Sequence, residues 1–302
     1  MIDFVGKRKV FVLLSSLLII ISLIFVFTKG FNLGVDFAGG TEFVISSDKE
    51  ISVGDIRNVL SSIKSDYATA KIAKLKNLNV EDSELFQYSV VLKESLSGST
   101  ELKEELINSI KEKFAENGIK IEFLEFNDVS GYAAEEIKSY AWYAVIISLV
   151  LLLAYISLRF KFSFGIGAIF ALAHDIIITM GFYSIFGIEI NVAAIAAFLT
   201  LAGYSLNDTI VVYDKIRENM KKLRGKKSIE EIVNTSINGV IVRSLNTSIT
   251  TFLVVLPILI WGGKAIAPFA FGLAVGVIVG TYSSLYIASP IVIGWIKKTK
   301  VY

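Results

Sequence analysis

Three ionisable residues inside long apolar stretches are the main candidates for chemistry in this sequence. Asp175, Asp208 and Arg243 lie in three successive stretches, and each is the only Asp, Glu, Lys or Arg in its stretch. A charge at the centre of a bilayer costs about 2.5–3.5 kcal/mol on insertion scales, so such residues usually face a bundle interior and mark an ion or proton pathway. We therefore predict that these three residues form a proton relay.

Asp208 and Arg243 could pair directly. Their stretches would cross a membrane in opposite directions, and a helix rise of about 1.5 Å per residue places both residues in its inner third. An arginine cannot release a proton, so its approach or withdrawal would decide whether the Asp208 carboxyl group is ionised. The alternative is a static ion pair that fixes the register of the two helices.

Asp175 lies near mid-membrane by the same helix rise, with His174 beside it as a supporting residue. The alternative for His174 is a structural hydrogen bond to a backbone carbonyl. A hydrolase that uses Asp175 or Asp208 with His174 is a further alternative. Aspartyl chemistry needs two carboxyl groups at close range, whereas these two differ in estimated depth by about half a leaflet.

Asp214 and Arg217 are further supporting candidates at the predicted inner interface. They are three residues apart on one helix, so an ordinary surface ion pair is the simpler interpretation.

The composition is that of a membrane protein. Hydrophobic residues make up 54% of the 302 residues and charged residues 19%, and the mean hydropathy is +0.63, which is more apolar than soluble proteins usually are. A net charge of +2 is too balanced for a nucleic-acid binder. With no cysteine and one histidine, disulfides, thiolate sites and a multi-histidine metal centre are excluded, and we expect no metal or cofactor.

Six apolar segments are long enough to cross a hydrocarbon core of about 30 Å as helices. For the first we expect a retained anchor rather than a signal peptide, since its apolar run exceeds a typical h-region and no small-x-small cleavage site precedes Lys29. The segments are Val10 to Thr28, Tyr140 to Leu158, Phe162 to Phe186, Val192 to Tyr213, Val240 to Trp261 and Pro268 to Trp295.

Basic residues in the short connections identify the cytoplasmic side. The N-terminus, the connection near Arg159, the loop 215–237 and the C-terminus together carry 15 Lys and Arg residues, whereas the two short loops on the other side carry one. Both termini are therefore predicted to be cytoplasmic.

Residues 30–138 are a predicted outer domain between two membrane parts, residues 1–29 and 139–302. Residues 29–139 hold 13 basic and 20 acidic residues, a net charge of −7. Strand-like and helix-like segments follow one another as β-α-β-β-α-β, an order typical of a ferredoxin-like sandwich. We therefore predict a six-helix, all-α transmembrane bundle with an inserted α+β domain. The strands are predicted at 41–46, 70–76, 86–93 and 119–127, and the helices at 52–64 and 100–117.

Small residues and prolines mark the last two apolar segments. Gly272, Gly276 and Gly280 recur at every fourth position, a pattern that allows another helix to approach closely. Pro257 and Pro290 could kink their helices, although both features could be wholly structural. Residues 228–237 are predicted to form a short amphipathic helix before the fifth segment.

Four stretches of the sequence, in order along the chain, have the form of family motifs. FNLGVDFAGGTEF at 31–43 resembles the signature that opens the periplasmic domain in the SecD and SecF family of the resistance-nodulation-division superfamily. The other three resemble SecF members in particular, and the match covers nearly the whole chain. They are AHDIIITMGFYSIFGIEIN at 173–191, GYSLNDTIVVYDKIREN at 203–219 and VIVRSLNTSITT at 240–251.

The resemblance implies a non-enzymatic subunit of the Sec translocase in the inner (plasma) membrane, one that uses the proton-motive force for late-stage preprotein translocation. The implied partners are SecD, the SecYEG channel, YajC as a further candidate, membrane lipid and a preprotein pushed by SecA. The acidic residue and the arginine on which the family relies fall on Asp208 and Arg243. Asn207 and Thr209 of the same motif would position or solvate the carboxylate.

The sequence is compatible with a second function and with either of two coupling ions. A proton-driven exporter of small molecules or lipids from the same superfamily is the main alternative function, although such chains usually carry twice as many spans in one polypeptide. An aspartate can couple to protons or to sodium ions, so the sequence leaves the coupling ion undecided.

Overall fold

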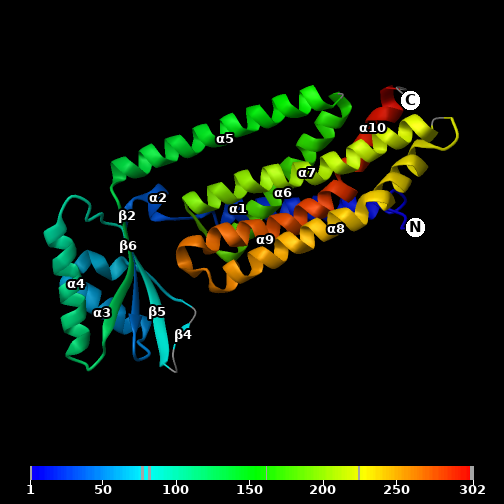
Figure 1. Ribbon diagram of the computed structural model, residues 1–302. Coiled ribbons are helices and arrows are strands. Elements are labelled where there is room, and N and C mark those ends of the chain that lie inside the picture. The colour runs from blue at the N-terminus through cyan, green and yellow to red at the C-terminus, as the bar shows by residue number, and fades with distance from the viewer. Residues whose placement is uncertain (1, 76–77, 81–82, 161, 224, 300–302) are drawn as a thin grey trace. The chain divides into compact units, whose positions relative to one another are not determined.

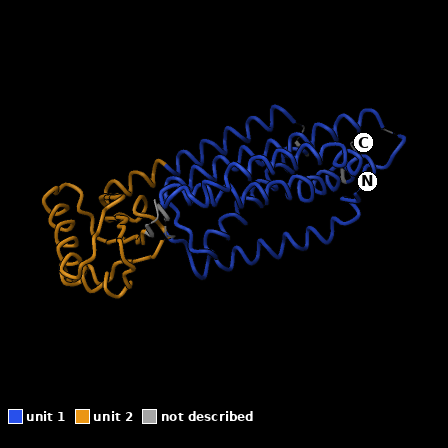
Figure 2. The backbone as a smooth tube through the Cα atoms, turned by 60° about the horizontal axis from the view of Figure 1, so that its bottom comes forward, with its two compact units in different colours: residues 1–32, 141–302 blue, residues 33–140 orange. Residues whose placement is uncertain are grey.

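The computed structural model describes residues 2–75, 78–80, 83–160, 162–223 and 225–299. The chain forms two compact units, which Figure 2 colours separately. The first holds residues 1–32 and 141–302, and the second holds Leu33–Tyr140. The second unit therefore begins three residues after the predicted outer domain begins, and ends two residues after it ends.

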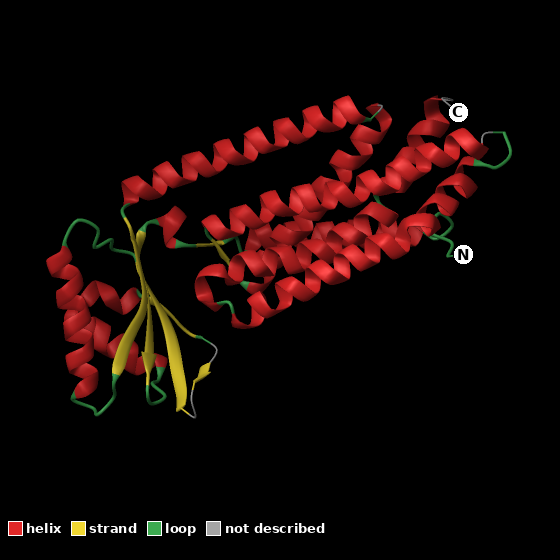
Figure 3. Cartoon of the chain, viewed as in Figure 1, coloured by secondary structure: helices red, strands yellow, loops and turns green. Residues whose placement is uncertain are grey.

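The second unit is an antiparallel sheet with two helices on one face (Figure 3). The strand order is β3-β5-β2-β6, with β4 paired to β5. This arrangement is the ferredoxin-like sandwich that the sequence predicts. Its elements are α2 (Val35–Ala38), β2 (Gly40–Ser47), α3 (Val53–Ile63), a 3-10 helix η1 (Ser65–Thr69), β3 (Lys71–Lys74), β4 (Leu78–Val80), β5 (Ser83–Leu92), α4 (Thr100–Ala115) and β6 (Ile121–Val129).

Periodicity in the sequence explains the core of this unit. Side chains alternate between the two faces of a strand, so Phe43 and Ile45 of β2 share the face that the helices cover. In α4, Leu106, Ile110 and Phe114 recur every fourth residue and line one side of the helix. All five side chains are almost completely buried in one apolar cluster with residues of α3 and β5, so sheet and helices hold together by removing this area from water.

Serine side chains define where both helices begin. Ser52 and Ser99 accept hydrogen bonds from the backbone N–H groups of Asp55 and Leu102, which satisfies donors that a helix start leaves without partners. The sequence did not predict β4 or the 3-10 helix, and β5 begins three residues before its predicted start. Residue 76 of the predicted strand 70–76 lies outside the described residues.

Gly40 sits where a side chain would not fit. Its φ is +118°, and a Cβ atom there would overlap the carbonyl oxygen of Leu92 on the neighbouring strand β5. We expect Gly40→Ala to destabilise the second unit by about 2 kcal/mol or more, because backbone strain adds to overpacking. Thermal unfolding of the full chain in detergent measures the change.

Gly98→Ala is the matched control, since Gly98 also has a positive φ, +97°, but no atom lies within 4 Å of its virtual Cβ. This variant should show only the backbone cost, about 1 kcal/mol. Equal losses in both variants would mean that the approach of Leu92 is irrelevant.

The first unit contains the six predicted spans as helices (Figure 1). Each is long and apolar enough to cross a membrane. Two short strands, β1 (Asn32–Leu33) and β7 (Glu189–Ile190), pair with each other. The helices are α1 (Arg8–Thr28), α5 (Gly131–Arg159), which starts in the second unit, α6 (Phe162–Phe186), α7 (Val192–Leu223), α8 (Ile229–Trp261), and α9 (Gly263–Tyr286) with α10 (Ala288–Thr299).

Three helices extend furthest beyond their predicted bounds. α5 begins nine residues before its predicted span, and α7 continues ten residues past Tyr213. The amphipathic segment 228–237 is continuous with the fifth span, because α8 starts beside Ser228 in a complete capping box with Glu231. The added residues at the ends of these helices are polar, so a search for apolar runs does not include them.

The sixth span is interrupted between α9 and α10. The helix stops at Ile287, and Pro290 lies in the first turn of α10, where a missing N–H is tolerated. Tyr213 of α7 donates a hydrogen bond of 3.2 Å to the carbonyl oxygen of Ala288 beside the interruption. α8, by contrast, continues through Pro257.

The glycines of α9 lie against two helices at close range. A Cβ on Gly276 would be 2.5–2.9 Å from the side chain of Leu201 on α7. A Cβ on Gly272 would meet Tyr183 of α6, and one on Gly280 would meet Ser205 and Asp175. Glycine at these three positions therefore permits α9 to pack closely against α6 and α7, and Gly280 does so beside Asp175.

Candidate functional site

Asp208 is buried between three helices and held by hydroxyl groups. Its side chain is 9% exposed. Ser244 of α8 donates to Oδ1 at 2.5 Å, and Ser284 of α9 donates to Oδ2 at 2.7 Å. The sequence argument that an ionisable residue here would face the bundle interior agrees with this position.

Arg243 does not pair with Asp208. No ion pair or hydrogen bond joins their side chains within the described part of the chain, and Arg243 is exposed. Its neighbour Ser244 occupies the position next to Asp208 instead. Successive residues on a helix point about 100° apart, so both side chains cannot face Asp208 at once. The direct pair expected from the sequence is absent from this conformation.

Asn207 and Thr209 do not hold the carboxylate either. Among the described residues, the hydrogen bonds to Asp208 come from Ser244 and Ser284 only. Asn207 is exposed on α7, whereas Thr209 is buried. Each is one residue from Asp208 and therefore points about 100° away from it. Their predicted contact with the carboxylate is not present.

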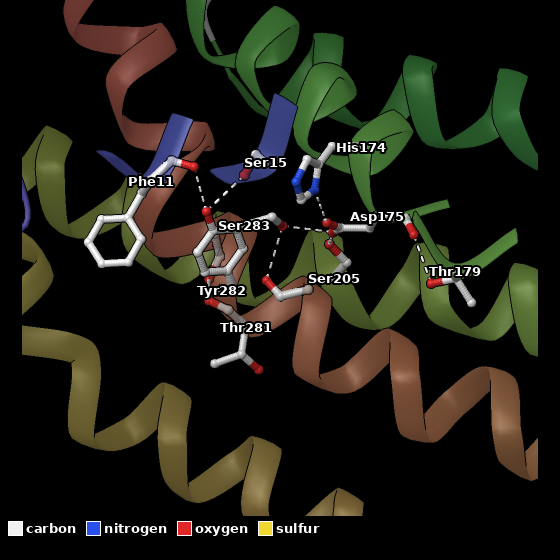
Figure 4. Close-up of polar contacts among 11 residues, drawn as sticks. Phe11, Ser15, His174, Asp175, Thr179, Ser205, Thr281, Tyr282 and Ser283 are labelled. Carbon is white, nitrogen blue, oxygen red and sulfur yellow. Dashed lines mark hydrogen bonds and ion pairs between the residues drawn. The ribbon is translucent and has the colours of Figure 1, made fainter. Parts of the chain in front are cut away.

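Asp175 lies in a second buried cluster, shown in Figure 4. It is completely buried, and Ser205 of α7 and Ser283 of α9 donate to its Oδ2 at 2.5 and 2.7 Å. Nδ1 of His174 lies 2.8 Å from Oδ1. His174 therefore contacts the neighbouring carboxylate rather than a backbone carbonyl, which was the structural alternative.

The two carboxyl groups are closer in depth than the sequence estimate of half a leaflet. Ser283 and Ser284, adjacent on α9, bond Asp175 and Asp208 respectively. On α7, Ser205 lies three residues before Asp208, which is about 4.5 Å along the helix. Each carboxyl group nevertheless has its own serine partners, so they do not form the shared-proton pair of an aspartyl hydrolase.

Both α9 serines can serve an ionised or a protonated carboxyl group. Ser284 Oγ lies 2.7 Å from Asp208 and 2.9 Å from the carbonyl oxygen of Thr281, and Ser283 Oγ lies 2.7 Å from Asp175 and 3.1 Å from that of Gly280. A hydroxyl group has one proton and can also accept. It donates to a carboxylate, or it accepts from a carboxylic acid and donates to the carbonyl. The carboxyl group and the serine therefore have hydrogen-bond partners in either protonation state.

More hydroxyl groups continue the row from Asp208 toward the N-terminal end of α7. Ser248 of α8 lies 2.5 Å from Thr281 Oγ1 of α9, and Tyr204 of α7 donates to Ser248 at 3.2 Å. The row was not predicted from the sequence. Burying a hydrogen-bonded hydroxyl group costs little free energy, so serine and threonine do not stand out in an apolar stretch as a charged residue does. The available signal was spacing, since Ser244 and Ser248 are four residues apart on one helix face.

Asp214 and Arg217 belong to a surface network rather than to this site. Asp214 accepts from Arg159 at 2.5 Å and from Arg217 at 3.3 Å, and all three side chains are 34–41% exposed. The surface interpretation of this pair therefore fits its geometry. The described residues contain no group of three or more His, Cys, Asp or Glu side chains that could hold a metal ion.

Comparison with known families accounts for most of the chain. Residues 109–298 match the family described as "Protein export membrane protein SecD/SecF, C-terminal", and residues 24–51 match the "SecD/SecF GG Motif". The chain belongs to the SecD/SecF family. The second match contains Gly39 and Gly40, the glycine pair at the start of β2.

Relatives in the SecD/SecF family extend this result to the full length. "Protein translocase subunit SecF" of Petrotoga mobilis is 62% identical over 299 residues, which cover 99% of this chain and 97% of that protein. "Protein translocase subunit SecDF" of Thermus thermophilus is 35% identical over 298 residues, 99% of this chain and 39% of that one.

A solved SecDF structure shares the fold. The crystal structure of SecDF from Thermus thermophilus superposes with a TM-score of 0.83 at 36% identity, over 98% of this chain and 39% of that chain. That SecDF is a translocon-associated membrane protein. Family membership makes this chain a multi-pass membrane subunit in protein export, a transport role rather than an enzymatic one.

Proposed function

We propose that this chain couples an ion gradient, carried by protons, to the late stage of protein export. Asp208 is the residue that takes up and releases the proton, Asp175 is a second relay group, and Arg243 is the movable charge that responds to Asp208. The observation that carries the proposal is a buried carboxyl group whose serine partners accommodate both of its protonation states.

The driving force is large enough for a conformational switch. One proton that crosses 100 mV releases about 2.3 kcal/mol, which shifts a two-state equilibrium about fiftyfold. In one state Ser244 faces Asp208, as here. In the other, a turn of α8 by about 100° would present Arg243, which stabilises the ionised carboxylate and favours release of its proton.

The close contact of α9 with α6 and α7 supports such a switch. Adjacent serines of α9 bond two different carboxyl groups, so a change at either group alters a contact of the same helix. The interruption between Tyr286 and Ala288 lies a few residues beyond them. Motion of α9 would then move the second unit, which acts as a lever on the emerging polypeptide.

Partners and orientation belong to the same proposal. The fused SecDF relatives, of which this chain spans 39%, favour SecD as the partner that completes the assembly. We propose the SecYEG channel, YajC and a SecA-driven preprotein as further partners. In the proposed orientation the chain lies in the inner membrane, its second unit is periplasmic and both termini are cytoplasmic. The excess of Lys and Arg on one side supports this orientation.

Vesicles that contain the chain with SecD, the channel and a trapped preprotein test the proposal and its coupling ion. A proton gradient imposed alone should drive both ion flux and completion of export, and a sodium gradient alone should drive neither. Export that follows only the sodium gradient would reassign the ion. Export that ignores both gradients would refute the coupling role, and transport of a small solute without preprotein would favour the exporter alternative.

A further inference from the structure

His174 has one ring nitrogen in use and one without a hydrogen-bond partner. Its side chain is 4% exposed, and Nδ1 lies 2.8 Å from Oδ1 of Asp175. Nε2 is one of two buried side-chain polar atoms in the described part of the chain that have no partner, the other being Ser289 Oγ. A ring nitrogen that accepts no hydrogen bond keeps its lone pair available, so Nε2 is the atom of this side chain that can take up a proton.

The surroundings of Asp175 determine which nitrogen is free. Ser205 and Ser283 donate to Oδ2, and Oδ1 is left for His174. With Asp175 as a carboxylate, Nδ1 carries the hydrogen and donates it, and the neutral ring keeps a lone pair on Nε2. A proton added to Nε2 forms an imidazolium beside the carboxylate and cancels the net charge of the pair.

We propose that His174 is the proton-accepting residue of a second proton-binding site, in which Asp175 fixes the orientation of its ring. This inference rests on the proposed proton coupling and assigns a residue to it. Because the side chain is buried, Nε2 does not contact bulk water.

Tyr282 links this site to the first transmembrane helix (Figure 4). Its ring is stacked on His174 with centroids 6.1 Å apart and planes at 28°. Its hydroxyl group donates to the carbonyl oxygen of Phe11 at 2.7 Å and lies 2.8 Å from Ser15 Oγ, both on α1. An imidazolium attracts an aromatic face more strongly than a neutral ring does, so protonation of His174 alters a contact that reaches α1.

Few other titratable groups face this pair. On α9 there is Tyr282, and on α7 there is Asp208, one turn beyond the Ser205 that bonds Asp175. α1 has no ionisable side chain between Val10 and Thr28, and Lys297 of α10 is paired with Glu230. A pH dependence of this region would therefore come from His174, Asp175, Asp208 or Tyr282.

A single histidine makes a direct measurement possible. ¹⁵N-histidine labelling of the untagged full chain in lipid nanodiscs gives one pair of ring signals, whose positions report tautomer and charge. We expect the neutral ring with hydrogen on Nδ1 at high pH and its conversion to imidazolium over a range of lower pH. A ring that stays neutral throughout, or that carries its hydrogen on Nε2, would overturn the proposal.

A variant tests whether this proton matters for transport. His174→Asn keeps an N–H group near the position of Nδ1 but has no titratable nitrogen. In vesicles with the partner subunit we expect proton flux to lose its pH dependence over the same range, and a purely structural role predicts a wild-type profile. The labelling experiment needs no transport, so it succeeds or fails independently of the coupling proposed for Asp208.

Discussion

Replacing Asp208 with asparagine will abolish proton-driven export and leave the bundle folded. Asparagine can accept from Ser284 through its carbonyl oxygen and donate to Ser244 through its amide, so both present contacts have a counterpart. It cannot take up a proton. We expect proton flux at the level of empty vesicles and export at the level without a gradient. Stability should change by no more than about 1 kcal/mol, as in substitutions that leave no buried polar group unpaired.

Asp214→Asn is the matched control for this variant. Asp214 lies on the same helix and also contacts charged or polar side chains, but it is 40% exposed and belongs to the surface network with Arg159 and Arg217. Exposed pairs contribute about 0–1 kcal/mol, and this variant should retain wild-type flux and export. An Asp208→Asn protein that retains wild-type proton flux and proton-driven export would refute the proposal. Equal losses of flux and export in both variants would indicate a folding defect rather than a loss of proton exchange.

The fold was predictable because a bilayer requires apolar runs of a certain length and a sheet requires apolar residues at alternate positions, and both patterns are visible in the sequence. Runs such as Val10 to Thr28 match the thickness of a hydrocarbon core, and the alternation in residues 41–46 matches a half-buried strand. Helix ends were less predictable, since the polar extension of α7 to Leu223 depends on contacts outside the membrane rather than on hydropathy.

The candidate site was predictable in its charges but not in its contacts. Asp175 and Asp208 stand out because a buried carboxyl group is expensive, whereas Ser283 and Ser284 are common in apolar helices and give no comparable signal. The rotation of α8 about its axis was also undetermined. Depth alone placed Arg243 level with Asp208, yet a difference of one residue puts Ser244 in that place.

The pairing of Asp208 with serines has a consequence for Arg243. If a static ion pair fixed the register of α7 and α8, removing the guanidinium would leave a buried unpaired carboxylate and cost about 3–5 kcal/mol. In this conformation Arg243 is exposed, and Asp208 is bonded to Ser244 and Ser284. We therefore expect Arg243→Gln to abolish proton-driven export while changing stability by less than about 1 kcal/mol. Thermal unfolding and flux, measured on one preparation, separate the two interpretations.

Two further variants sharpen this test. Arg217→Gln removes a partly exposed guanidinium that contacts Asp214, and it should leave flux and stability close to wild type. Arg243→Lys keeps the charge but loses the planar fork that binds a carboxylate through two N–H groups, so we expect partial export. A strongly destabilised Arg243→Gln protein would support the static pair, and one that retains full export would remove Arg243 from the mechanism. Loss of export with retained stability would support a second state in which the guanidinium reaches Asp208, because the two side chains do not contact each other in the present one.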